Sequence, residues 1–133
     1  MAITTSIDRE AGIALQVVDG PLAIDEVVDA QRRLYSDPEF DPSMPVLWDA
    51  TGGSAAEMTF DGIREMVARS RDLWEKMPPG RTAILVARTV DFGMGQMYSI
   101  LASDMPREVR AFRDRDQALQ WLRGGELSAE VGP

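Results

Sequence analysis

Five polar residues follow two apolar runs of the chain, and their side chains are of types that bind or polarise a ligand. The runs are Val46–Trp48 and Ile84–Val86, and the polar residues after them are Asp49, Thr51, Ser54, Arg88 and Thr89. An unbroken apolar run is typical of a strand that is covered on both faces of a parallel sheet. If the two runs are neighbouring parallel strands, the polar residues gather at the carboxyl edge of the sheet, where open α/β sheets bind their ligands.

Within this set, Arg88 is the residue best suited to an anion. A helix is expected to begin near Asp91, and its free N–H groups together with Arg88 suit a carboxylate or a phosphate. The alternative is that Arg88 pairs with Asp49 and that Asp91 only caps its helix, which requires no ligand. Catalysis by Asp49 with Arg88 is less favoured, because the pair lacks a proton shuttle.

The composition excludes several classes of enzyme. The chain has no Cys and no His, and Lys76 is its only lysine. Thiol nucleophiles, disulfides, Cys-ligated zinc and Ser-His-Asp catalysis are therefore excluded. An all-carboxylate metal site or a mechanism that uses Lys, Asp or Glu is left open, and we predict no catalytic residue, no metal and no cofactor. A net charge of -8 disfavours nucleic acid and acidic membranes as partners. Because no apolar run approaches ~20 residues, we expect a cytoplasmic protein of bacterial type without stable membrane insertion.

Methionine is abundant, with eight residues, and several recur on two predicted helices. Met is flexible and lines apolar pockets that adapt to their ligands. One interpretation is a pocket between these helices with Arg88 holding an acidic head group, and the other is that the same residues form ordinary core. The predicted ligand-binding set adds Met94, Met97 and Tyr98 to the five polar residues. The wider methionine group is Met66, Met77, Met94, Met97 and Met105.

The hydrophobic pattern predicts an α/β fold with the order β-β-α-β-α-β-α-β-α. Strands are expected at 3–7, 12–18, 45–48, 81–87 and 108–112, and helices at 24–35, 60–77, 91–102 and after Asp114. Parallel neighbours joined through helices require right-handed crossovers. A chain of 133 residues is long enough for one core. We expect one domain at 1–123 and a flexible tail at 124–133.

Several local features have structural interpretations. Thr59 is a good N-cap for the second helix. The glycines of Gly93–Gly95 do not form a dinucleotide-binding loop, because the third glycine is missing, and close packing of the helix on the sheet explains them better. Residues 52–58 are expected to form a flexible link, and Trp121 to be the most exposed tryptophan. The last strand should be an edge whose arginines face solvent, namely Arg107, Arg110, Arg113 and Arg115.

With these elements in place, the chain resembles the STAS-like group, relatives of the anti-sigma-factor antagonist SpoIIAA, some of which are grouped with the CRAL-TRIO lipid carriers. The resemblance is carried by the segments Pro45–Ala50, Asp91–Tyr98 and Val109–Asp114, the last leading into Ala118–Leu122. It implies a single SpoIIAA-like α/β domain, coiled as a (βα) superhelix, with a mixed five-stranded sheet and about four helices.

The resemblance also implies a function. We expect a non-enzymatic regulatory module that contacts a protein partner, or a second copy of itself, through residues 52–59 and the second helix. In antagonists of this type a partner kinase phosphorylates a Ser at the start of that helix, and Thr59 is the residue here that corresponds to it. The alternative function is a carrier or sensor of an apolar or amphipathic small molecule, such as a lipid, held in the methionine-rich pocket.

Overall fold

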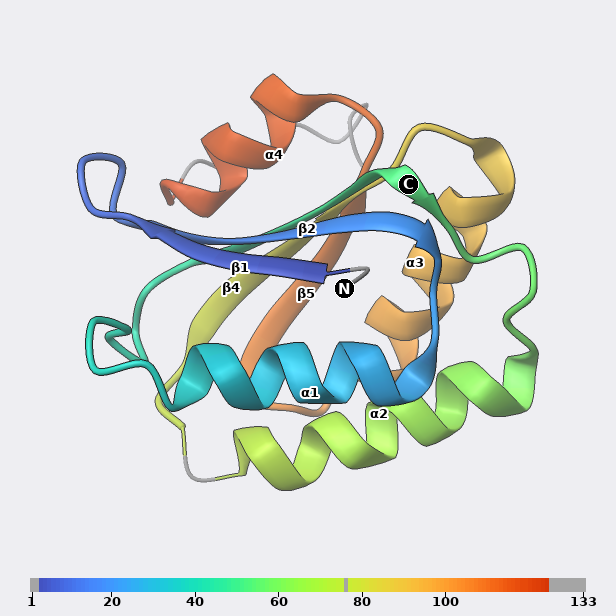
Figure 1. The fold of residues 1–133 in the computed structure, drawn as a ribbon, viewed down its shortest axis with the longest axis horizontal. Coiled ribbons are helices and arrows are strands. Elements are labelled where there is room, and N and C mark those ends of the chain that lie inside the picture. The colour runs from blue at the N-terminus through green and yellow to red at the C-terminus, as the bar shows by residue number, and fades with distance from the viewer. Residues whose placement is uncertain (1–2, 76, 125–133) are drawn as a thin grey trace.

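The computed structural model describes residues 3–75 and 77–124 (Figure 1). Its elements are, in chain order, β1 (Ile3–Asp8), β2 (Ile13–Pro21), α1 (Ile24–Tyr35), β3 (Val46–Ser54), α2 (Phe60–Trp74), β4 (Gly80–Leu85), α3 (Thr89–Leu101), β5 (Arg107–Phe112) and α4 (Arg115–Leu122). The predicted fold class and element order are therefore confirmed. Of the predicted tail, residues 125–133 lie outside the described residues.

The five strands form one mixed sheet in the order β1-β2-β3-β4-β5. β1 and β2 are an antiparallel hairpin, and β2 to β5 are parallel. The two apolar runs lie side by side as predicted, because Trp48 of β3 pairs with Ile84 of β4. β1 and β5 are the two edges of the sheet. The carboxyl ends of β3 and β4 therefore meet at one rim.

The helices cover the sheet unequally. Figure 1 shows α4 on one side of the sheet and α1 and α2 on the other. The larger core cluster lies between the sheet and α1, α2 and α3, and it contains Val27, Met66 and Tyr98. The smaller cluster lies beneath α4 and contains Leu47, Leu85 and Trp121. A strand such as β3 is thus apolar on both faces because helices cover both.

Side chains define the starts of two helices as predicted. The Thr59 hydroxyl accepts from the N–H of Gly62 at 2.9 Å, and the Asp114 carboxylate accepts from the N–H of Gln117 at 3.0 Å. Both contacts satisfy N–H groups that have no partner within the helix. α2 ends at Trp74, three residues earlier than predicted (Met77), and α3 begins at Thr89, two residues earlier than predicted (Asp91).

The prediction of a flexible link at 52–58 is wrong at its beginning. β3 continues to Ser54, because Gly52 and Gly53 pair with Asp19 and Gly20 of β2. A Cβ on Gly53 would lie 2.7 Å from Cγ1 of Val18, so only glycine permits this close approach of the two strands. Ser54 is therefore positioned by the sheet.

Two predictions about side-chain exposure are also wrong. Arg107 was expected on a solvated edge, but it is 0% exposed, because it shares the helix-covered face of β5 with Val109. Trp121 was expected to be the most exposed tryptophan, but it is 3% exposed. Its ring packs against Phe112 of β5 at 5.6 Å, and the guanidinium of Arg81 covers it at 5.0 Å.

Candidate functional site

An apolar cavity of about 80 Å³ lies between the sheet and helices α1, α2 and α3. Its residues on β4 and just beyond are Thr82, Ile84 and Val86, which share one face of the strand. At about 3.3 Å per residue, these positions extend over roughly 13 Å. The lining therefore extends along β4 from the interior toward the rim. Its lining residues are Val18, Leu22, Val27, Gln31, Trp48, Ala50, Gly53, Ser54, Ala55, Ile63, Met66, Trp74, Thr82, Ile84, Val86, Asp91, Met94, Gly95 and Tyr98.

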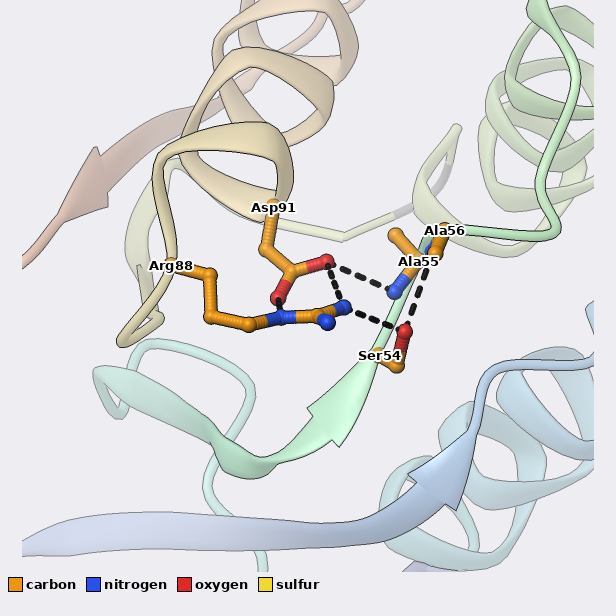
Figure 2. Close-up of polar contacts among 5 residues, drawn as sticks. All are labelled: Ser54, Ala55, Ala56, Arg88 and Asp91. Atoms are coloured by element: carbon orange, nitrogen blue, oxygen red, sulfur yellow. Dashed lines mark hydrogen bonds and ion pairs between the residues drawn. The ribbon is translucent and has the colours of Figure 1, made fainter.

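The rim end of the cavity is lined by residues of a polar network between β3 and α3 (Figure 2). The Asp91 carboxylate accepts from the backbone N–H of Ala55 at 2.8 Å and from Nε of Arg88 at 2.8 Å. Arg88 also donates to the Ser54 hydroxyl, which in turn accepts from the N–H of Ala56. The end of β3 is thereby tied to the first turn of α3. Arg88 and Asp91 thus bond to each other, while Arg88 also bonds to the side chain of Ser54 and Asp91 to the backbone of Ala55.

Asp91 is held in its charged form. Burial by itself raises the pKa of this carboxyl, but the hydrogen bonds from Arg88 and Ala55 and the charge of Arg88 outweigh it, so the pKa lies below its ordinary value. The prediction that Asp91 only caps its helix is wrong, because its acceptors are used by Ala55 and by Arg88. A carboxylate with a lowered pKa is a weak general base near neutral pH.

The inner part of the cavity has a polar wall, a hydrogen-bonded cluster of the three helices of which Gln31, Trp74 and Tyr98 line the cavity. The hydroxyl of Tyr98 donates to Ser70 at 2.7 Å, and Ser70 exchanges hydrogen bonds with the amide of Gln31. Beside them, the Trp74 indole N–H donates to the Tyr35 hydroxyl at 2.7 Å. Burial raises the pKa of Tyr98, which therefore stays neutral. This wall offers hydrogen-bonding groups without net charge.

Asp49 and Thr51 lie at the same rim as Ser54 but on the opposite face of the sheet. Asp49 accepts from the Thr51 hydroxyl at 2.6 Å and forms an ion pair with Arg115 of α4. The prediction that Arg88 pairs with Asp49 is therefore wrong. Side chains alternate between faces along β3, so odd positions face α4 while Ser54 faces α3. Burial raises the pKa of Asp49, but hydrogen bonds from Thr51 and Arg115 outweigh it and hold the pKa below its ordinary value.

The other predicted site residues lie on helices. Met94 and Tyr98 line the cavity, whereas Met97 is not among the described residues that line it. Thr89 is exposed as the first residue of α3, and Thr59 is exposed at the start of α2. Phosphorylation of Thr59 stays a prediction. Of the five methionines of the predicted group, Met66 belongs to the larger core cluster, and the other four are partly buried and pack against it: Met77, Met94, Met97 and Met105.

Sequence reasoning missed the polar residues of the inner wall. Gln31, Ser70 and Thr82 are all buried. Gln31 and Ser70 sit among the apolar positions of α1 and α2, and Thr82 is the one polar residue within the apolar part of β4. A polar residue in the apolar stripe of an amphipathic helix is the signal that points to such a wall.

Among residues 3–75 and 77–124, no group of three His, Cys, Asp or Glu side chains is arranged to hold a metal ion. None of the helices in these ranges is both long enough and apolar enough to span a membrane.

Comparison with known proteins identifies the fold. No family model and no curated protein sequence matches the chain. Its structure is similar to the crystal structure of an uncharacterised protein of the DUF3478 family with a SpoIIAA-like fold, from Shewanella loihica PV-4. The two chains are 17% identical, the match covers 91% of this chain and 92% of the other, and the TM-score is 0.52. The described chain therefore has a SpoIIAA-like fold, as its sequence resemblance implies.

Proposed function

We propose that this protein is a non-enzymatic binding module of the STAS-like type and that it carries or senses a small apolar molecule. The observation that carries this proposal is the apolar cavity, lined by side chains from the sheet and from three helices. Ligand sites are concave, mostly apolar and supplied with a few hydrogen-bonding groups. Gln31, Thr82 and Tyr98 are such groups here. At about 80 Å³ the cavity suits a small ligand, since an engineered apolar cavity of roughly 150 Å³ admits benzene.

The test uses the methionine methyl groups as reporters. The protein is labelled with ¹³C at its Met methyl groups and titrated with xenon under pressure, which enters dry apolar cavities. We expect saturable shifts for Met66 and Met94, which line the cavity, and much smaller ones for Met97. The same purified protein is examined by native mass spectrometry for a retained small molecule. Linear shifts of equal size at all three methyl groups, with no retained molecule, would contradict the proposal.

A matched pair of variants separates filling of the cavity from a general effect of a larger side chain. Met94→Trp places a ring in the cavity, whereas Met97→Trp adds the same ring to the same helix away from the lining residues. Both methionines are partly buried. We expect Met94→Trp to abolish the saturable shift of Met66 and Met97→Trp to retain it. Retention in both variants, or loss in both, would count against binding in this cavity.

A second candidate function is contact with another protein, and exposed apolar side chains near the rim favour it. Phe60 in the first turn of α2 is 51% exposed, and Val90 in the first turn of α3 is 49% exposed. Both helices begin close to the network that joins Ala55 to Asp91. Self-association is the simplest form to test, by sedimentation over a hundredfold range of concentration. We expect Phe60→Ser to weaken any association, and strictly monomeric wild-type protein excludes a second copy as partner.

A location in the cytoplasm, a single domain at 1–123 and modification of Thr59 remain predictions of the same hypothesis. An apolar ligand in the cavity and a protein contact near the rim are compatible with each other. The rim network connects them, because Ser54, Ala55 and Asp91 line the cavity, Asp91 belongs to the first turn of α3, and Ser54 and Ala55 precede α2 in the chain.

A further inference from the structure

Two buried side-chain atoms in the described part of the chain have no hydrogen-bond partner, and they lie on adjacent strands. They are Oγ1 of Thr82 on β4 and Nε of Arg107 on β5. Thr82 is 3% exposed and lines the cavity, and Arg107 is 0% exposed. Buried polar atoms in folded proteins are almost always bonded, so each exception calls for a physical explanation.

Arg107 is a buried cation whose described partners are all neutral. Its Nη1 donates to the carbonyl of Pro42 at 2.9 Å, and its Nη2 donates to the carbonyl of Met44 at 3.3 Å. Among the described residues, no Asp or Glu forms an ion pair with it. Burial lowers the pKa of Arg107, and the facing hydroxyl of Tyr35 does not supply a negative charge, because its own pKa is raised by burial. A buried guanidinium without an anion is electrostatically unfavourable.

The two atoms share one face of the sheet. Arg107 pairs with Gly80 and Val109 pairs with Thr82, so Thr82 and Arg107 occupy diagonal positions on the face that α1, α2 and α3 cover. The guanidinium lies directly over Gly80, where a Cβ would be only 2.5 Å from Nη1. The absence of a side chain at Gly80 thus makes room for the cation beside the inner end of the cavity. Thr82 lines this end of the cavity and offers an O–H donor, and the charge of Arg107 lies at the diagonal position on the same face, behind the lining residues.

We infer that the inner end of the cavity binds the carboxylate of a short-chain monocarboxylic acid, whose apolar chain then extends toward the rim. This inference rests on the proposed function, and it names the class of ligand and its orientation. A carboxylate accepts from the Thr82 hydroxyl and brings its negative charge close to Arg107, the buried cation that lacks an anion. The rim is less suitable for the acid group, because Asp91 already occupies Nε and Nη2 of Arg88.

Matched ligands of equal length test the preference for an acid. Butyrate, 1-butanol and n-butylammonium are titrated into the wild-type protein at pH 7, with calorimetry for affinity and the Met66 methyl signal for location. We expect butyrate to bind at least about tenfold more tightly than 1-butanol, the factor of a single charge-assisted hydrogen bond. The ammonium ion should bind more weakly than the alcohol, because Arg107 repels it.

Two variants decide the orientation, one at Thr82 in the proposed binding site and one at Arg88 in the rim. Thr82→Val keeps the shape of the side chain but removes the hydroxyl, and we expect it to reduce the preference for butyrate over 1-butanol several-fold. Arg88→Gln changes the half-exposed arginine of the rim and should leave this preference unchanged. Circular dichroism of each variant shows whether it is folded, and Thr82→Ser, which retains the hydroxyl, should restore the preference.

The outcomes separate this inference from the proposed function. If 1-butanol and butyrate bind in the cavity with equal affinity, the inference is overturned and the proposed function stands. If Arg88→Gln removes the preference while Thr82→Val does not, the acid group lies at the rim and the orientation is wrong. If xenon, butyrate and 1-butanol all fail to bind, the proposed function itself fails.

Discussion

Removal of the Asp91 carboxylate should destabilise the protein more than removal of its arginine partner does. Asp91 is 4% exposed and accepts from the N–H of Ala55, which is also buried. Arg88 is half-exposed, so its ion pair with Asp91 is screened by water. The backbone contact, rather than the ion pair, should therefore dominate the contribution of Asp91 to the free energy of unfolding.

The magnitudes follow from this geometry. Asp91→Ala leaves the buried N–H of Ala55 without an acceptor and should cost about 2 kcal/mol. Asp91→Asn keeps a neutral acceptor for this N–H but loses the charge, and should cost about 1 kcal/mol. Arg88→Gln removes only the screened pair and should therefore cost clearly less than Asp91→Ala.

The contribution of Asp91 should also depend on pH. Because its folded-state pKa lies below the ordinary value of 3.8, its stabilising effect is fully present above that value. As the pH falls through the folded-state pKa, Asp91 becomes protonated and the effect is lost. The difference in unfolding free energy between wild type and Asp91→Asn should therefore be constant from pH 5 to 7, on the order of the 1 kcal/mol above, and shrink below about pH 4.

Urea unfolding followed by tryptophan fluorescence measures all three variants, since Trp48, Trp74 and Trp121 are buried. The series is run at several pH values between 3 and 7, and the wild-type protein is the reference at each. The reasoning is refuted if Arg88→Gln costs as much as Asp91→Ala, or if the difference between wild type and Asp91→Asn grows as the pH falls.

Three further predictions concern the helices and are measured by the same unfolding assay. On α3, Gly93 has open space where a Cβ would lie, so Gly93→Ala should stabilise the protein by about 0.5–1 kcal/mol. Gly95→Ala should not stabilise it, because the new Cβ would lie 3.0 Å from the Cβ of Ala111. Equal effects of the two substitutions would show that packing does not distinguish these glycines. Thr59→Ala should cost about 1 kcal/mol through loss of the N-cap of α2, and Thr59→Asp, which retains an acceptor, should restore the wild-type value. Arg115→Gln should change stability by less than about 1 kcal/mol, since the arginine of the pair with Asp49 is half-exposed, and a larger loss would mean that this pair anchors α4.

The elements of the fold were predictable because each rests on many residues at once. The stripe of apolar residues in α1 and the stop at the prolines after it predict the helix Ile24–Tyr35, and the structure has the same bounds. The pairing of β3 with β4 followed from two unbroken apolar runs joined through a helix. A single unusual residue changes the apolar pattern of a whole helix or strand very little.

The contacts at the rim were less predictable, because they depend on which face of a strand each side chain occupies. Asp49 and Ser54 follow the same apolar run, yet one faces Arg115 of α4 and the other faces Arg88. A strand that continues for two glycines past its apolar part cannot be recognised from propensity, since glycine is depleted in strands. The pairing of Gly53 with Gly20 is a requirement of close packing that appears only when β2 lies beside β3.

The burial of Arg107 could not be predicted from the residue type and its position on an edge strand. An arginine on an edge strand is usually solvated. Glu108, the residue after Arg107 on the edge strand β5, is indeed exposed. Alternation along β5, however, places Arg107 on the same face as Val109, and that face is covered by helices. Gly80 on the neighbouring strand β4 makes the burial of Arg107 possible, because any side chain at position 80 would collide with the guanidinium. A buried charge of this kind depends on residues 27 positions apart in the chain. Departures from local rules of this sort are expected at functional positions, and here the departure lies beside the inner end of the cavity.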